Sequence, residues 1–444
     1  MRHLSLVLLL VLPAAARAET LLPPDPVLAG YLADALHDNL TLRQRRFSVD
    51  EARAALAQVR AQWLPSVNLE ARASERWGAV LDLGQLVNPA YAALNQLVGR
   101  PAFPTDLEVA LPLKRETKLV ATQPLFAPAL YFANGVRKEE LAVEQARWQG
   151  VARQLRAEVQ TAYYQHGRTR AVVELLDQTR ALLEENLRVS QLLVANGKAT
   201  EDAVHRARAE LSELLQRREE ADAGVEATGR YLNFLTGNPL DAPVPRPPVP
   251  AAVLPRTLDS RGSARDELAA LAAGRRAAGQ AARLAKSAYL PTLALAGEYG
   301  FQGDSYDFSL DRDYLVVSLV LRWNLFGGGG DRARVRQAQL VGERLATQDQ
   351  ELRRQIELQV RQAWRAADTV RLAIDASADR VESTRASYAL VSRRYAAGAA
   401  PPELLDARTA MTRAEVDRIS SRYELAIKLA ELERVAALAP EVTP

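Results

Sequence analysis

Hydrophobic and polar positions alternate with a period of two in several stretches of the chain. The clearest stretch is "YLVVSLVLRWNLFGGGG", which runs from Tyr314 to Gly330. Every second residue from Leu315 to Leu325 is apolar, whereas Ser318, Arg322 and Asn324 lie in the opposite row. This alternation predicts a strand with one face in apolar and one in polar surroundings. Similar runs begin near Val67 and Leu293, and a weaker one covers residues 114–125.

Long segments with apolar residues at spacings of three and four predict helices. One such seam runs from Leu155 to Val194 and another from Ile356 to Tyr395, and sustained heptads of this kind are typical of coiled coils. A second seam, from Val172 to Leu193, indicates a helix that is contacted on both sides, as in a closed ring of helices. A helix over residues 128–196 would be roughly 100 Å long. A shorter helix, from Val204 to Leu235, would return from its tip.

The two halves of the chain repeat one another in the same order, which indicates a duplicated helix–strand–strand–helix unit. The matched segments are "QWLPSVNLEAR" and "AYLPTLALAGE", "TQPLF" and "RWNLF", "EVQTAYYQ" and "QVRQAWRA", and "VANGKAT" and "YAAGAAP". A proline-rich segment joins the halves, and its proline density favours an extended path without helix. The expected organisation is a signal peptide at 1–18, a first repeat at 19–236, a linker at 237–261 and a second repeat at 262–444.

The strand runs reach about the 9 to 11 residues that a membrane-crossing strand requires. Two levels of aromatic residues flank them, which is typical of a lipid-facing barrel. Tyr289 and Trp323 form one level, and Tyr299, Phe301, Tyr306, Phe308 and Tyr314 form the other. Four strands per chain cannot close a barrel, because single-chain membrane barrels use at least about eight. We therefore expect an α+β membrane protein in which a trimer forms a 12-stranded β-barrel continued by a long α-helical coiled-coil barrel, with Gly327, Gly328, Gly329 and Gly330 as the strand-to-helix hinge.

Composition narrows the chemistry. The chain has 444 residues, a formal charge of +3 and no cysteine, so neither a basic nucleic-acid surface nor a thiolate site is indicated. The N-terminus has the charged, apolar and A-x-A parts of a secretory signal peptide, with cleavage expected after Ala18. The isolated His37, His166 and His205 fit no metal or catalytic spacing, and "GGGGDR" lacks the lysine of a phosphate-binding loop. We expect no catalytic residue, no metal site and no cofactor.

The duplicated unit, the Leu64-Pro65 and Leu290-Pro291 strand entries and "NLFGGG" resemble the TolC-like outer membrane efflux proteins. The resemblance implies a homotrimeric channel-tunnel in the outer membrane that extends into the periplasm. It also implies a passive exit duct that works with a periplasmic adaptor protein and an inner-membrane transporter in efflux or type I secretion, without nucleic acid. The cargo, whether drug, metal, dye or protein, and the class of transporter stay open.

The same resemblance implies that two turns at the helix tips dock the adaptor. These are Gly197, Lys198, Ala199 and Thr200, and Gly398, Ala399, Ala400 and Pro401. Helix capping also explains both glycines, and the two roles are compatible. Tyr395 matches the family's gate tyrosine, but Ala400 replaces the gate arginine. Glu403 and Asp406 each lie one residue from the family's acidic positions, so they form either a shifted gate ring or, as we favour, a solvated helix face.

One segment departs from the duplication. Residues 84–108 have no counterpart in the second half and are expected to form an enlarged extracellular loop, with a plug over the pore as an open alternative. A periplasmic coiled-coil spacer without a pore is the rival interpretation of the whole chain. The repeated strand pairs argue against it, because a spacer does not need them.

Overall fold

The computed structural model describes residues 21–23, 25–75, 77, 81–107, 110–111, 114–249, 251, 254, 264–303, 312–396 and 401–438. The proposed signal peptide therefore lies outside the described residues. The helices are α1 (Pro26–Asp38), α2 (Leu40–Ala61), α3 (Gly84–Val98), α4 (Pro128–Ala195), α5 (Glu201–Thr236), α6 (Asp266–Lys286), η1 (Ser287–Tyr289), α7 (Gly330–Ala396) and α8 (Pro401–Ala436). The strands are β1 (Ser66–Ala73), β2 (Leu81–Asp82), β3 (Ala110–Leu111), β4 (Arg115–Phe126), β5 (Thr292–Gly303) and β6 (Asp313–Arg322).

The chain divides into two compact units. One holds residues 52–141 and 274–344, and the other holds residues 1–51, 142–273 and 345–444. The first, here called the sheet unit, contains every strand found in the described residues. The second, here called the helical unit, contains α1, α5, α8 and the greater part of α4 and α7.

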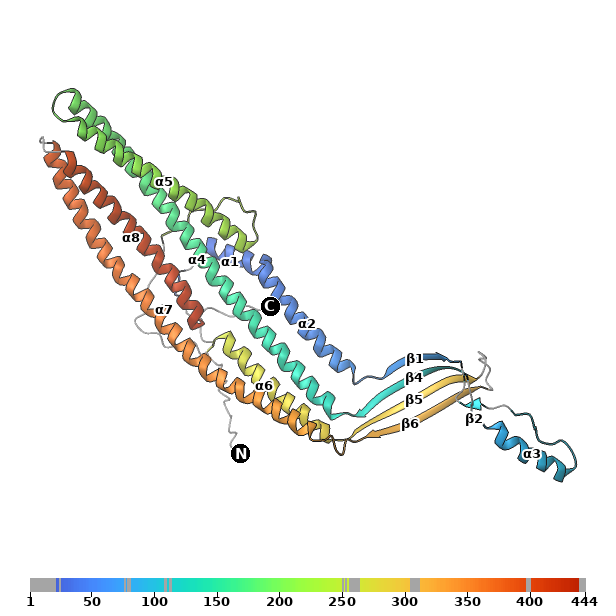
Figure 1. The fold of residues 1–444 in the computed structure, drawn as a ribbon. Helices are drawn as coiled ribbons and strands as arrows, with labels where there is room; N and C mark the ends of the chain where they lie inside the picture. The colour runs from blue at the N-terminus through green and yellow to red at the C-terminus, as the bar shows by residue number, and fades with distance from the viewer. Residues whose placement is uncertain are drawn as a thin grey trace, which may run out of the picture. The chain divides into compact units, whose positions relative to one another are not determined.

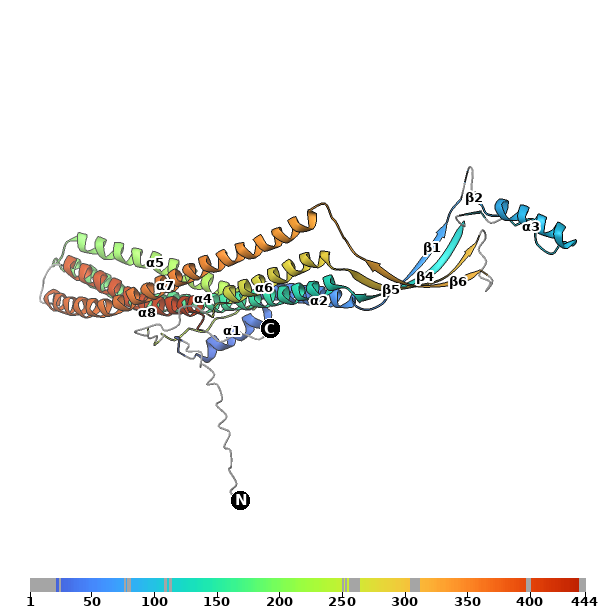
Figure 2. The same ribbon diagram turned by 90° about the horizontal axis from the view of Figure 1, so that it is seen from below.

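The main sheet of the sheet unit has four antiparallel strands in the order β1, β4, β5, β6 (Figure 1). Figure 2 shows the same four strands from below, twisted about one another. Leu69 pairs with Leu119, Leu119 with Tyr299, and Tyr299 with Leu315. All four strands expected from the alternation are present, including the weakly alternating one, which is β4.

The strand entries follow from proline chemistry. β1 begins directly after Leu64-Pro65 and β5 directly after Leu290-Pro291. Proline disfavours helical geometry in the residue before it, and Leu290 accordingly has extended dihedral angles of −98° and 146°. The preceding helices α2 and α6 therefore end before these prolines, and the chain changes to strand in both repeats.

The helical unit consists of two helical hairpins, α4 with α5 and α7 with α8 (Figure 1). Leu176 and Leu183 of α4, Leu214 of α5 and Leu405 of α8 form one buried cluster. Most of the first predicted seam of α4 is buried in this way, but the second seam is only half-buried, with Leu182 47% exposed. Within the described part of one chain, α4 thus retains a second apolar seam that is not fully covered.

The side-chain amide of Asn39 joins the start of α2 to the end of α5 in the helical unit. Asn39 caps α2, because its Oδ1 accepts the N–H groups of Thr41 and Leu42 at 3.0 and 3.1 Å. Its Nδ2 donates to the carbonyl of Leu235 near the end of α5, at 2.9 Å. One buried side chain therefore fixes the start of α2 against the end of α5.

The described part of the proline-rich linker, residues 237–249, contains neither helix nor strand. Asn233 donates to the carbonyls of Leu240 and Ala242 at 3.0 and 2.8 Å, and Tyr423 donates to that of Pro247 at 3.1 Å. A Cβ on Gly167 would lie 2.9 Å from Pro247, so only glycine lets the linker lie this close to α4. This part of the linker is therefore packed against the helical unit.

The segment expected as an enlarged loop contains a helix. Residues 84–98 form α3, and the loop expectation therefore missed a regular element. None of the helices in the described ranges combines the length and apolarity that a membrane-crossing helix needs.

Candidate functional site

The register of the main sheet separates its two faces. Cross-strand partners share a face, so the apolar row of β6 continues through β5 and β4 to β1. The side chains of this row are largely exposed in a single chain: Val67 65%, Leu69 70%, Leu119 46%, Leu295 40%, Leu315 69%, Val317 65%, Leu319 64% and Leu321 63%. A continuous apolar surface of this kind marks contact with lipid or protein rather than with water.

The opposite face of the sheet carries a network of charges. Lys118 Nζ lies 2.9 Å from a carboxylate oxygen of Glu298, 3.6 Å from Glu116 and 3.9 Å from Glu70. Tyr314 donates to Glu116 at 2.8 Å, so all four strands contribute to the network. Charged groups require a polar environment unless they are fully paired. The two faces of this sheet are therefore suited to different media, one apolar and one aqueous.

Aromatic side chains lie at both ends of the sheet. At the end next to the helices, Trp323 Nε1 donates to the carbonyl of Tyr289 at 3.1 Å. At the other end, the rings of Tyr299 and Phe301 pack edge to face with centroids 5.8 Å apart. Two further residues expected at this level, Tyr306 and Phe308, lie outside the described residues.

Gly327, Gly328 and Gly329 lie between β6 and α7, and Gly330 begins α7; two of the four glycines adopt positive φ, 60° at Gly328 and 83° at Gly329. A Cβ on Gly327 would approach a carboxylate oxygen of Asp331 to 2.6 Å. Asn324 donates to that same carboxylate at 2.8 Å. The turn thus uses glycine for its dihedral angles at Gly328 and Gly329, and Asp331 joins the end of the strand to the start of the helix.

The first tip turn connects α4 and α5. Gly197 has φ of 67°, and its N–H and that of Lys198 bond to the carbonyls of Val194 and Leu193 at 2.9 and 2.8 Å. This is the glycine-capped end of a helix, as the capping interpretation expects. Gly197, Lys198 and Thr200 are exposed, whereas Ala199 is half-buried.

The second tip turn is described only in part. Gly398, Ala399 and Ala400 lie outside the described residues, Pro401 begins α8, and the backbone of Tyr395 lies in the last turn of α7. Glu403 and Asp406 are exposed, whereas Leu405 between them packs into the buried cluster. Both carboxylates therefore lie on the solvent-facing side of α8 in the single chain.

Sequence reasoning missed the polar contacts that join α7 and α8. Arg408 is 9% exposed, and its guanidinium lies 5.3 Å from the ring centre of Tyr388, which is a cation–π geometry. Arg385 pairs with Glu415 at 2.8 Å. No spacing in the sequence identifies these pairs, because each joins two helices at separations set by the hairpin.

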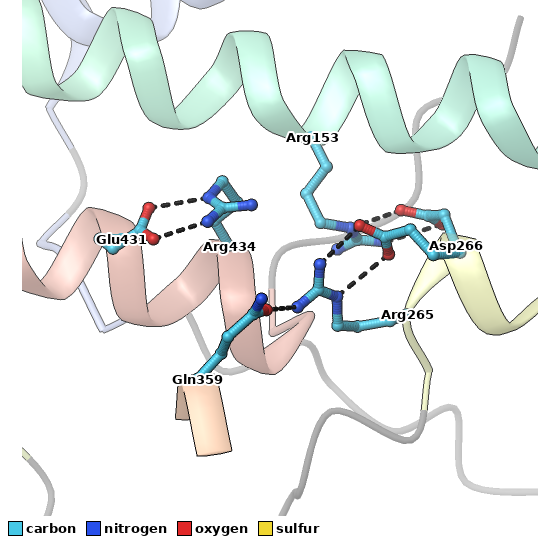
Figure 3. Close-up of polar contacts among 7 residues, drawn as sticks. Arg153, Arg265, Asp266, Gln359, Glu431 and Arg434 are labelled. Atoms are coloured by element: carbon cyan, nitrogen blue, oxygen red, sulfur yellow. Dashed lines mark hydrogen bonds and ion pairs between the residues drawn. The ribbon is translucent and has the colours of Figure 1, made fainter. Parts of the chain in front are cut away.

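A second missed feature is a buried cluster of charges in the helical unit (Figure 3). Arg153 of α4 binds Asp266 through two hydrogen bonds of 2.8 and 3.3 Å, and the two side chains are 9% and 8% exposed. Arg265 donates to Gln359 of α7 at 2.6 Å and to Glu267 at 3.0 Å. Burial alone would raise the pKa of Glu267, but the hydrogen bond from Arg265, a backbone hydrogen bond and the nearby charges of Arg265 and Arg434 together outweigh burial and lower that pKa. The cluster attaches the start of α6 to both long helices.

The end of α8 holds the N-terminal segment. Glu433 is 1% exposed, and its carboxylate accepts the N–H of Leu22 at 3.0 Å and the side-chain amide of Gln160 at 3.3 Å. Burial raises the pKa of Glu433, although these bonds and nearby Arg156 oppose the rise. Tyr163 donates to Asp25, the N-cap of α1, at 2.8 Å. The segment before α1 is therefore fixed by buried side chains of α4 and α8.

Comparison with known proteins agrees with this geometry. Residues 261–437 match the family model of the outer membrane efflux proteins. A search of curated proteins returned no match.

Solved structures show the same fold over nearly the whole chain. CusC, described in terms of folding and transmembrane channel formation, aligns with a TM-score of 0.78 and 16% identity, covering 93% of this chain and 92% of that one. The CmeC outer membrane channel of Campylobacter jejuni aligns with a TM-score of 0.76 and 17% identity over 94% of this chain and 87% of that one. The open state of the MtrE outer membrane channel of Neisseria gonorrhoeae aligns with a TM-score of 0.71 and 18% identity over 95% and 92%.

The fold of this chain is therefore the fold of these outer membrane channels, mostly helical with a small antiparallel sheet. The resemblance to the TolC-like outer membrane efflux proteins is thus confirmed, by sequence over residues 261–437 and by fold over nearly the whole chain.

Proposed function

We propose that three copies of this chain form an outer membrane channel-tunnel, which serves as the passive exit duct of a tripartite efflux or type I secretion system. The observation that carries the proposal is the main sheet, which exposes a continuous apolar row on one face and a charge network on the other. Lipid on the first face and a water-filled pore on the second satisfy both. A sheet inside a soluble spacer would leave the apolar face in water.

Closure of the barrel requires other copies. β1 and β6 are the edges of the four-stranded sheet, and unpaired edges in a membrane leave backbone groups unsatisfied. Because the strand number per chain is even, β6 of one copy and β1 of the next run antiparallel, as every other neighbouring pair in the sheet does. Three copies supply 3 × 4 = 12 strands, an even number within the range of membrane barrels.

The long helices are proposed to continue the channel into the periplasm. The half-exposed second seam of α4 is suited to a helix of a neighbouring copy in a ring. The turn at Gly197–Thr200, and the second turn at Gly398–Pro401, would then lie at one end of the tunnel and dock the adaptor, which connects the channel to an inner-membrane transporter. Tyr395 is the proposed gate residue, and Glu403 and Asp406 are secondary candidates.

Engineered cysteines test the trimer, because the chain has no cysteine of its own. Asn68→Cys on β1 is combined with Ser318→Cys on β6, both on the polar face. Within one chain these edges lie about 14 Å apart, three strand spacings of ~4.8 Å, which is too far for a disulfide. Oxidation in membranes should therefore yield linked dimers and trimers. Because the register between copies is not fixed, Val316→Cys and Val320→Cys are scanned in parallel.

The control replaces Val317 by cysteine with Asn68→Cys, since Val317 lies on the opposite face of the sheet. This pair should not cross-link. The purified protein should have a three-fold mass and conduct ions in planar bilayers. A monomer without cross-links would contradict the proposal, and a non-conducting trimer that alkali removes from membranes would support the spacer instead.

A further inference from the structure

The segment inserted between β1 and β4 is a built element with two distinct faces. β1 and β4 end at Ala73 and Arg115, which pair with each other. The segment between them therefore leaves the sheet at the end opposite to Ser66 and Thr122, where the chain connects to α2 and α4. It contains α3 and residues 99–107, here called the strap, which run back along the helix (Figure 1).

Two asparagines hold the strap on one face of α3. Asn95 donates to the carbonyl of Phe103 at 2.7 Å and accepts the N–H groups of Ala102 and Phe103, both at 2.8 Å. Asn88 binds both the N–H and the carbonyl of Leu107, at 3.0 and 2.9 Å. Between them, the rings of Tyr91 and Phe103 stack with centroids 5.5 Å apart. Residues 88, 91 and 95 share one side of a helix and all three are half-buried, so the strap covers part of that side.

The start of α3 shows that this contact is specific. A Cβ on Gly84 would lie 1.7 Å from the carbonyl oxygen of Leu107, so no residue other than glycine fits against the end of the strap. Gly99, which ends the helix, has φ of 70° and starts the strap in the reverse direction.

The opposite face of α3 is apolar and uncovered in the single chain. Leu86, Ala90, Ala93 and Leu97 follow spacings of four, three and four, and all are exposed, Leu86 by 72% and Leu97 by 84%. Leu94 and Val98 beside them are 41% and 50% exposed. An exposed apolar stripe on an otherwise ordered element marks a contact surface.

The absence of charged residues on α3 indicates what kind of partner it contacts. From Gly84 to Val98 it carries no charged residue, so it has neither the cationic face of a membrane-surface helix nor a charge to recognise a partner of opposite sign. An uncharged stripe with two alanines between leucines suits close packing against identical helices, because symmetric copies would repel one another if they carried charge. In the proposed trimer, three such segments emerge at the same rim of the barrel.

We propose that the three α3 helices of the trimer pack against one another through Leu86, Ala90, Ala93 and Leu97 and close the extracellular mouth of the channel. This inference rests on the proposed function, because it requires the three-fold assembly. The occupant of the stripe is a second copy of this chain, and the strap keeps each helix in the orientation that presents the stripe to its neighbours.

Leu97→Cys tests the contact in an otherwise cysteine-free chain. Three copies around one axis allow one disulfide per trimer, so oxidation should link up to two of the three chains into a dimer. Gln96→Cys is the matched control, because residue 96 is also exposed but lies to the side of the stripe, and it should link far less. Equal cross-linking of both variants, or of neither, overturns the proposal.

Conductance gives an independent readout. Leu86→Glu with Leu97→Glu places like charges on all three stripes, so the helices should separate and single-channel conductance should rise severalfold. Gln85→Glu with Gln96→Glu adds the same charge beside the stripe and should leave conductance near that of the parent. Because the proposed gate at Tyr395 lies in series with this mouth, both pairs of variants are measured in the Tyr395→Ala background, and unchanged conductance of the leucine variant there counts against a closed mouth.

The disulfide between Asn68→Cys of one copy and Ser318→Cys on β6 of the next copy tests the trimer independently of the α3 contact. If that cross-link forms and Leu97→Cys does not link, the trimer stands and the α3 contact is wrong. If neither forms, the proposed function itself fails. A photo-reactive side chain at position 97 that labels lipid rather than a second chain would assign the stripe to the membrane and overturn the proposal.

Discussion

Removing the cation of the buried Arg153–Asp266 pair should loosen the start of α6. In Arg153→Met the carboxylate of Asp266, 8% exposed, loses the two hydrogen bonds that neutralise it (Figure 3). Breaking a buried pair from one side costs about 3–5 kcal/mol. Asp266 is in the first turn of α6, and the helix dipole stabilises its carboxylate in the parent and in the variant alike, so the dipole does not change the loss. We take the lower end of that range, about 3 kcal/mol, as the expected loss.

The loss should appear as faster hydrogen exchange in the first turns of α6, residues 266–273, measured by mass spectrometry on the assembled protein. Since about 1.4 kcal/mol corresponds to a factor of ten, protection there should fall roughly a hundredfold.

Two further variants test whether an unpaired buried charge causes the defect. Arg168→Met removes a pair of similar kind, with Glu424 at 3.2 Å, but those side chains are 35% and 29% exposed, so the expected loss is only about 0–1 kcal/mol. Arg153→Met combined with Asp266→Leu removes both buried charges and should restore protection close to that of the parent. If the double variant exchanges as fast as the single one, the defect comes from lost packing and not from an unpaired charge.

Three further predictions concern other parts of the chain. Burial raises the pKa of Glu433 above its ordinary 4.5, so the stability it contributes is fully present below pH 4.5 and is lost as the pH rises through the folded pKa. Chemical unfolding of Glu433→Gln over this range should therefore show a weaker decline of the unfolding free energy with pH than the parent does. Gly329→Ala should cost about 1–2 kcal/mol in thermal stability of the trimer, because φ is 83° at this position and no atom lies within 4 Å of the added Cβ. Gly330→Ala is the control, because it has the same free space but no positive φ, and it should cost little. Equal losses in the two variants would contradict a backbone cause. Tyr395→Ala should raise single-channel conductance and Asp406→Asn should weaken block by divalent cations, and parent-like behaviour in both would move the gate elsewhere.

The local patterns of the sequence predicted the secondary structure well. A period of two identified β5 and β6, and the Leu-Pro pairs marked where β1 and β5 begin, because proline acts on its immediate neighbour. The heptad seams predicted α4 to within one residue at its C-terminal end, 196 against Ala195. The glycine run predicted an abrupt turn, which the positive φ of Gly328 and Gly329 explains.

The insertion was predicted less well. We expected a loop because the segment has no counterpart in the second half, yet it contains α3, and Asn88 and Asn95 bind the strap to that helix. Such bonds depend on two segments meeting, and no periodicity reports that. Only the structure distinguishes the exposed face of α3, with Leu86 and Leu97, from the face that the strap contacts.

By itself, the sequence determined the repeat, the strands, the long helices and the separation of apolar from polar rows, because each follows from residues within a few positions of one another. Only the tertiary structure decided which of the many charged residues matter. Arg153 meets Asp266 across 113 positions and Glu433 meets Leu22 across 411, and in both cases burial makes the contact significant. Burial depends on how whole helices pack against one another, a property that no local pattern contains.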